Sequence, residues 1–259
     1  MRNNRSFLAI GLLFAFSCLL SSCKPADIGA DLPKITAREL AESIIARAQP
    51  FSAKGVVRYK GGFLAFVEAE FLCDPKLGLR IDLFTPFGTP AAVFALRHDH
   101  AEFLSIGERL LIRGKSKDLA SRIFKLDVDP GGLPWLLAGG LPPNLKGWRF
   151  ESPEKKDPDV LILTAKDETG NSYHAVLQGK NYLVSEFVVY GPDSNEPLQL
   201  AECGNHLDGI APIPRRLTLS GPALENDLEI TLRDLEVGKG PDADILTLKS
   251  APGVRVEDL

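Results

Sequence analysis

The hydrophobic pattern of this chain changes at Pro50 from a helical period to a period of two residues. Alternating apolar and polar residues place their side chains on opposite faces of a β-strand. Turn residues separate the alternating segments about every 8 to 12 residues, which is typical of an antiparallel sandwich or barrel. The pattern predicts strands at residues 53–59, 63–71, 79–83, 92–96, 103–106, 110–112, 148–151, 160–164, 173–177, 182–190, 198–203, 216–220 and 228–235.

Helical patterns occur at three places. Thr36 and Glu39 have the spacing of a capping box, and an apolar stripe follows until Pro50 ends the helix. Two short helices are predicted at residues 118–125 and 133–138, between the sixth and seventh strands. Open sheets rarely exceed ~10 strands without curling, so this sheet should curl, with the helices over one face or mouth of it.

The first 24 residues carry the features of an export signal. Arg2 and Arg5 precede a largely apolar run of 14 residues, from Phe7 to Leu20. That run is too short to cross a bilayer, for which about 20 residues are needed, and is typical of a signal-peptide core. These features are shared by three kinds of segment: a lipoprotein signal, an ordinary secretory signal and an uncleaved anchor.

The sequence Leu20-Ser21-Ser22-Cys23 resembles a bacterial lipobox, in which the cysteine is acylated and the chain is cut before it. This predicts a lipoprotein whose lipid anchor is Cys23 and whose only attachment to the membrane is that lipid. The expected divisions are a signal peptide at 1–22, a lipidated tether at 23–34, a single domain at 35–250 and a loose tail at 251–259.

The charge balance excludes one class of partner. Of the 30 Lys and Arg residues, 28 remain after the signal peptide, against 34 Asp and Glu. An acidic chain without a basic run is not expected to bind nucleic acid. Two cysteines, Cys73 and Cys203, remain after the signal and the anchor; they could form a disulfide in an oxidising compartment or be two small buried residues.

We find no catalytic set in the sequence. It contains no HExxH, CxxC, G-x-S-x-G or phosphate-binding loop. His98-Asp99-His100 could offer two metal ligands, but no third ligand is evident and a turn is the better interpretation. We therefore expect a protein that is not an enzyme and has neither a cofactor nor a metal.

The segment Ile81 to Leu96 reads IDLFTPFGTPAAVFAL, in which Pro86-Phe87-Gly88 joins two apolar strands. The chain here resembles the LolB family of outer-membrane lipoprotein receptors, within the LolA–LolB carrier superfamily. The resemblance is carried by this segment, the lipobox, the capped helix and the later L-P-W-L-L-A-G-G-L-P. Recognisable residues run from about position 36 to 143. In that family an exposed leucine in a P-L-G loop enters the membrane, and Phe87 takes its place here.

The resemblance implies a mainly β fold: a strongly curved, unclosed antiparallel barrel with an N-terminal helix and short lid helices over a hydrophobic cavity. It implies that Pro86, Phe87 and Gly88 form a membrane-insertion loop, although Phe87 could instead fold back into the core. Period and resemblance together give the candidate cavity lining: Phe71, Ile81, Leu83, Phe94, Leu104, Leu119, Ile123, Trp135 and Leu136.

The implied function is that of a monomer anchored to the outer membrane and facing the periplasm. It would accept lipoprotein acyl chains from a periplasmic lipoprotein carrier and insert the lipoproteins into the outer membrane. The alternative is a cell-envelope lipoprotein that uses the same curved sheet as a sensor or assembly module.

Overall fold

The computed structural model describes residues 35–59, 66–124, 130–151, 157, 159–192, 194, 196–206, 212–222 and 227–259. The predicted signal peptide, Cys23 and the tether lie outside these residues. Ile35–Leu259 forms one unit. None of the described helices is long and apolar enough to cross a membrane.

Helix α2 opens this unit and is capped as the sequence predicts. The Thr36 hydroxyl accepts a hydrogen bond from Glu39 N (3.2 Å), and Glu39 Oε2 accepts one from Thr36 N (2.7 Å). Such a cap stabilises a helix by about 1 kcal/mol. The first half comprises α2 (Ala37–Arg47), β1 (Phe51–Tyr59), β2 (Val67–Asp74), β3 (Gly78–Phe84), β4 (Pro90–Arg97), β5 (His100–Ser105) and β6 (Leu110–Lys115).

Short helices interrupt the strands at the predicted place, and strands then resume. The helical segment comprises α3 (Ser116–Phe124), the 3₁₀ turn η1 (Pro130–Gly132) and α4 (Leu133–Leu137). The second half comprises β7 (Lys146–Glu151), β8 (Val160–Lys166), β9 (Ser172–Gln178), β10 (Leu183–Tyr190), β11 (Pro197–His206), β12 (Pro214–Ser220), β13 (Leu228–Val237), the 3₁₀ turn η2 (Ala243–Leu246) and β14 (Arg255–Asp258).

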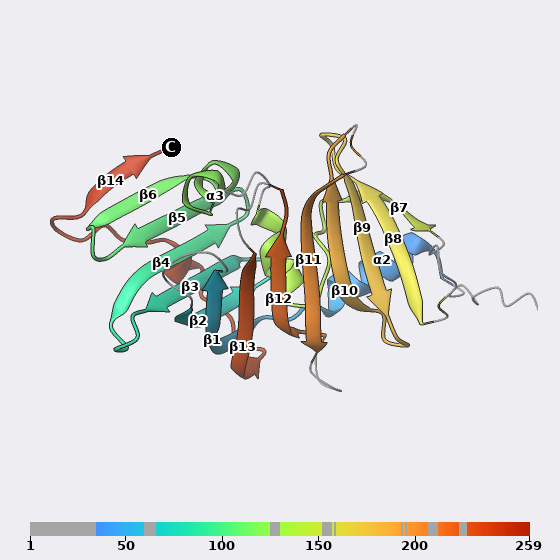
Figure 1. The fold of residues 1–259 in the computed structure, drawn as a ribbon, viewed down its shortest axis with the longest axis horizontal. Coiled ribbons are helices and arrows are strands. Elements are labelled where there is room, and N and C mark those ends of the chain that lie inside the picture. Colours follow the sequence, from blue (N-terminus) through green and yellow to red (C-terminus); the bar gives the residue numbers. More distant parts are fainter. Residues whose placement is uncertain are drawn as a thin grey trace, which may run out of the picture. The chain divides into compact units, whose positions relative to one another are not determined.

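The fourteen strands of the described residues belong to one sheet, in the order β14-β6-β5-β4-β3-β2-β1-β13-β12-β11-β10-β9-β8-β7. The strands at its two ends, β14 and β7, do not pair with each other, so the sheet is not closed. It bends around the helices, with α2 beside β7 and α3 beside β5 and β6 (Figure 1). The predicted class, a curved and unclosed β-barrel with short helices, is confirmed.

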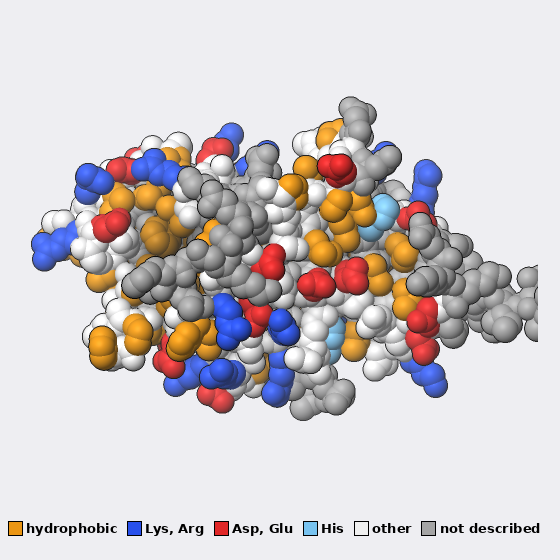
Figure 2. Space-filling model, viewed as in Figure 1, with side chains coloured by type: hydrophobic (Ala, Val, Ile, Leu, Met, Phe, Trp, Pro, Cys, Tyr) orange, Lys and Arg blue, Asp and Glu red, His pale blue; other side chains and the backbone are white. Residues whose placement is uncertain are grey.

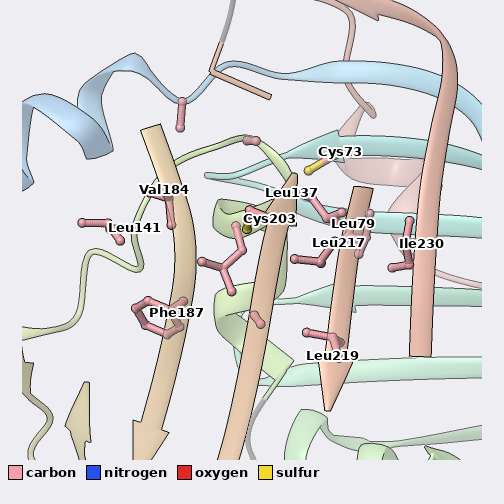
Figure 3. Packing of buried hydrophobic residues seen from close by; sticks show 14 of the residues in the cluster. Cys73, Leu79, Leu137, Leu141, Val184, Phe187, Cys203, Leu217, Leu219 and Ile230 are labelled. Carbon is pink, nitrogen blue, oxygen red and sulfur yellow. The ribbon is translucent and has the colours of Figure 1, made fainter. Parts of the chain in front are cut away.

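The core lies on the side of the sheet that faces the helices. Alternate residues of the strands point to this side; in β1 these are Phe51, Ala53 and Gly55, all buried. Side chains from both halves of the sheet and from the helices join in one cluster (Figure 3). Its largest fully buried members are Phe51, Phe71, Leu40, Ile44, Leu79, Leu96, Leu119, Leu137, Leu141, Leu163 and Leu177.

The end of the chain is not the loose tail expected at 251–259. Arg255–Asp258 forms β14, which pairs in parallel with β6, from Arg255 opposite Leu110 to Asp258 opposite Arg113. We call residues 243–258 the C-terminal strap. Its Leu248 packs on the outer face of the sheet in a second buried cluster with Val93, Ala95 and Leu111.

A buried carboxylate holds the C-terminal strap. The Glu102 side chain is 5% exposed and accepts a hydrogen bond from Leu248 N (2.5 Å). Arg113 donates to Leu248 O (2.6 Å), and its Nε lies 3.3 Å from Glu102 Oε1. Both main-chain polar groups of Leu248 are therefore bound by an ion pair that projects from β5 and β6.

Candidate functional site

The predicted cavity-lining residues fall into two groups. Eight of them join the core cluster on the helix side: Phe71, Ile81, Phe94, Leu119 and Leu136 are buried within it, and Leu83, Ile123 and Trp135 are partly buried against it. The expected lining therefore comes together on one face, contributed by strands and by the short helices. In the described part of the chain these side chains belong to, or pack against, one buried cluster.

Leu104 is the exception, and its assignment to the lining is wrong. It lies opposite Val93 and Leu111 in the sheet and packs against the outer cluster under the C-terminal strap. Its neighbour Phe103 faces the core instead. The two residues are both apolar because the strap covers the outer face here, so alternation could not tell the two sides apart.

Helices α3 and α4, which we call the lid, cover the core side of the sheet. Leu119 of α3 and Leu137 of α4 are fully buried in the core cluster. Leu137 points into this cluster, whose members Leu79 and Leu217 come from β3 and β12 (Figure 3). The lid is short, at nine and five residues for its two α-helices.

The end of α4 is fixed by a glycine in a left-handed conformation. Gly139 has a φ of 71°, and Gly139 N and Gly140 N donate to Leu136 O (3.0 Å) and Trp135 O (2.8 Å). A Cβ at position 139 would lie 2.0 Å from Pro212 O, so no other residue fits this turn. The helix predicted at 133–138 therefore ends at its predicted place.

Both remaining cysteines are free and buried, so of the two alternatives the structure shows separate buried thiols rather than a disulfide. Burial raises the pKa of Cys73 well above its usual value and that of Cys203 to about 12. Cys73 Sγ donates a hydrogen bond to Pro134 O (3.3 Å), which ties β2 to the first turn of α4. Neither thiol is a nucleophile at neutral pH.

Much of the helix-side core lies outside the predicted lining. Leu137 and Leu141, Leu163 of β8, Leu177 of β9 and Phe187 of β10 belong to the same cluster but were not among the predicted lining. The signal was present, because the last three lie at inward positions of strands that the alternation predicts. The predicted lining does not extend to Leu163, Leu177 and Phe187 because the recognisable resemblance ends near residue 143.

A pocket of about 360 Å³ lies away from the core. It is lined by Leu77, Arg97, His98, Asp99, His100, Ala243 and Leu246, at the β2–β3 and β4–β5 turns and η2. None of the predicted lining residues reaches it. His98 and Asp99 form the β4–β5 turn, with His98 in a left-handed conformation (φ 50°), as expected for a turn rather than for a pair of strand ligands.

The side of the barrel near the end of α2 is held by a cation. Arg47 donates hydrogen bonds to the main-chain oxygens of Asn181 and Tyr182 at the start of β10. Burial lowers the pKa of Arg47. Burial also lowers the pKa of His206, and the positive charge of Arg47 lowers it further because it disfavours the protonated ring. The His206 ring lies 3.0 Å from Val184 O.

The turn between β3 and β4 presents an aromatic side chain to solvent. Phe87 is 93% exposed. Gly88 N donates to Thr85 O (2.8 Å), Thr85 N donates to Thr89 O (2.8 Å), and Gly88 has a φ of 76°. The Thr85 hydroxyl also accepts from Phe87 N (3.3 Å) and lies 2.6 Å from the Thr89 hydroxyl. The turn is thus closed by several hydrogen bonds, and the alternative of Phe87 folding into the core is excluded.

This architecture occurs in solved structures of other proteins. A LolA superfamily protein, NE2245 from Nitrosomonas europaea, superposes with a TM-score of 0.57 at 12% identity, over 83% of this chain and 98% of that one. A putative outer membrane lipoprotein-sorting protein domain from Vibrio parahaemolyticus gives a TM-score of 0.51 at 11% identity, over 81% and 94%. The chain has a LolA/LolB-like fold.

A DUF1329 family protein from Desulfovibrio piger shares the LolA/LolB-like fold, with a TM-score of 0.57 at 14% identity over 82% of this chain and 95% of that one. No family model and no curated protein matches the chain. The similarity to these proteins is therefore one of fold alone.

Proposed function

We propose that this chain is a lipid-anchored envelope protein that binds the acyl chains of lipoproteins and inserts the lipoproteins into the outer membrane. The observation that carries the proposal is the apolar helix-side face of an unclosed sheet, covered by a short lid. The LolA/LolB-like fold and the lipobox at Cys23 support it.

The packed core is compatible with an acyl-chain site because the lid can be exchanged for the ligand. Burying one methylene stabilises by about 0.8 kcal/mol, so a chain of roughly 15 methylenes gives up to about 12 kcal/mol. The main apolar side chains of the lid are Leu119, Leu136 and Leu137. Each stabilises the closed state by about 1.5–3 kcal/mol, so the acyl chain exceeds the three leucines together. Ile123 and Trp135 of the lid, which are partly buried, narrow this difference.

No cofactor or energy source is needed if acyl chains pass from a weaker to a stronger site. The donor in this proposal is a periplasmic lipoprotein carrier, and the acceptor is the outer membrane, which the Pro86-Phe87-Gly88 turn contacts. The protein acts as a monomer and not as an enzyme. In the described residues, no group of three or more His, Cys, Asp or Glu side chains lies together in a way that could hold a metal.

The close packing of the core cluster also favours a second candidate, an envelope sensor or assembly module that binds a protein partner on the same sheet. A fluorescent fatty-acid analogue separates the two. A carrier takes the analogue up into an apolar site and its emission shifts to the blue, and a hydrophobic competitor reverses the shift. An interaction module leaves the emission unchanged, and that result would reject the carrier proposal.

The insertion step is tested by Phe87→Glu. Because Phe87 is 93% exposed, this substitution should change the free energy of unfolding of the protein by no more than about 0.5 kcal/mol. Uptake of the fatty-acid analogue should be unchanged, while transfer of a bound lipoprotein into liposomes should slow. Phe94→Glu is the matched control, since Phe94 is buried and a charge there should unfold the protein.

A further inference from the structure

Exposed hydrophobic side chains gather at one end of the first six strands. Phe66 is 54% exposed, Phe87 is 93% exposed and Ile106 is 40% exposed. Phe66 directly precedes β2, Phe87 lies between β3 and β4, and Ile106 directly follows β5. Because these strands are antiparallel, the start of β2, the β3–β4 turn and the end of β5 lie at the same edge of the sheet.

The pairing register places the three side chains along one line. Glu68 pairs with Phe84, so Phe66 lies beside the start of the β3–β4 turn. Ile106 N donates to Ala91 O (3.0 Å), which places Ile106 beside the other limb of that turn. Three steps of about 4.8 Å separate β2 from β5, so a surface roughly 15 Å wide can contact all three residues.

The space-filling view agrees with this arrangement. In Figure 2 hydrophobic side chains gather at the lower left, over the region of the β3–β4 turn in Figure 1. We propose that Phe66, Phe87 and Ile106 form a single membrane-contact rim, in which Phe87 enters the bilayer first and the other two follow. This inference rests on the proposed function and extends its membrane contact from one turn to three strand ends.

A lipid bilayer is the occupant that fits these residues. They protrude from strand ends and turns rather than lining a groove, and aromatic and aliphatic side chains on such projections enter the interface of a bilayer. Eleven residues, and so twelve Cα-to-Cα steps, connect the lipid-anchor candidate Cys23 to Ile35. At full extension they span at most roughly 40 Å, so an anchored protein always has the bilayer within reach.

Charges at this edge are mixed. Arg58 and Arg109 are exposed there, and so are Glu68 and Glu108. Attraction to anionic lipid is therefore weak, and apolar contact should dominate the binding. It follows that rim contact should depend little on salt, unlike the binding of a basic patch.

Site-specific labelling tests the rim in the full-length anchored protein. Phe66→Cys, Phe87→Cys and Ile106→Cys are each labelled with the environment-sensitive dye NBD and reconstituted into vesicles of phosphatidylethanolamine and phosphatidylglycerol. Leu77→Cys is the matched control, because Leu77 is 39% exposed but lies at the β2–β3 turn, at the opposite end of the strands. Cys73 and Cys203 are buried, so they should not take up the dye.

We expect a blue shift and increased emission at all three rim positions, unchanged at high salt, and none at the control. Emission that changes only at Phe87→Cys would overturn the rim in favour of a single tip. No change at any of the three would show that this edge does not contact the membrane. Each outcome is read independently of uptake of the fatty-acid analogue, which tests the carrier proposal itself.

A functional variant gives a second measurement. Phe66→Ser combined with Ile106→Ser leaves Phe87 in place and should slow lipoprotein transfer to liposomes by about tenfold, from the apolar area lost. Uptake of the fatty-acid analogue should be unchanged, which also shows that the variant is folded. Transfer at the wild-type rate would contradict the rim. If the wild-type protein itself takes up no fatty-acid analogue, that result would instead contradict the proposed function.

Discussion

Leu137→Ala should weaken the folded protein and yet tighten its binding of acyl chains. Leu137 lies on α4, is fully buried and points into the core cluster (Figure 3). Truncating a buried leucine to alanine costs about 2–5 kcal/mol. If an acyl chain displaces the lid, Leu137 is packed in the core only while the lid is closed. The substitution then destabilises mainly the closed state.

The size of the effect follows from the opening equilibrium. A shift of about 2.8 kcal/mol raises the ratio of open to closed lid by about 100-fold. Apparent affinity is the intrinsic affinity multiplied by the fraction of open protein, so the apparent Kd should fall by up to the same factor until the open state predominates. The assay is a titration with the fluorescent fatty-acid analogue, under conditions where circular dichroism shows both proteins folded.

Leu79→Ala is the matched control. Leu79 is also fully buried in the core cluster, but it belongs to β3 and stays with the sheet whether the lid is open or closed. The control should lose comparable stability without any gain in affinity. If Leu137→Ala loses stability and binds no more tightly than Leu79→Ala, the lid does not compete with the ligand and the exchange mechanism is wrong.

Three further perturbations have expected outcomes. Cys23→Ala should abolish labelling by metabolic palmitate, and label retained by the variant would reject the lipobox assignment. Glu102→Gln should lower the free energy of unfolding by about 2 kcal/mol in a denaturant titration, which is less than the cost of about 3–5 kcal/mol for breaking a fully buried pair because Arg113 is 29% exposed. A change below about 0.5 kcal/mol would show that the carboxylate does not hold the C-terminal strap. Desolvation raises the pKa of Asp167, but hydrogen bonds from Tyr173, Thr169 and Asn171 outweigh it and lower the pKa to about 2. The pKa of Asp167 is thus lower in the folded protein than in the unfolded chain, so its contribution to stability is present above about pH 4 and is lost as the pH falls towards 2. Asp167→Asn should therefore make the free energy of unfolding depend less on pH in this range. An acid-unfolding curve identical to that of the wild-type protein would show that these hydrogen bonds do not stabilise the fold.

The parts of the fold that the sequence predicted are those set by local patterns. The cap at Thr36 and Glu39 depends on residues three positions apart. The exposed tip at Phe87 depends on a turn that Pro86 and Gly88 favour by their own conformations. The strands up to β13 follow from alternation, which a half-buried sheet imposes on each strand separately.

The parts that the sequence could not predict depend on distant partners. Arg255–Asp258 has no apolar alternation, and it is a strand only because β6 offers an open edge some 140 positions earlier. The C-terminal strap covers the outer face of β4 and β5, so apolar residues are buried on both faces of these strands. For this reason alternation places Leu104 on the wrong side. The packed state of the core is a property of the whole cluster, and no single strand carries a signal for it.

The central claim, that the sheet and lid bind acyl chains, is tested most directly with a lipopeptide in two forms. The full-length protein is titrated with a triacylated lipopeptide and with the same peptide lacking its acyl chains, and heat is measured by calorimetry. We predict saturable one-to-one binding of the acylated form, with a negative heat-capacity change from apolar burial, and no binding of the bare peptide. Equal binding of the two forms, or no binding of the acylated form, would contradict it.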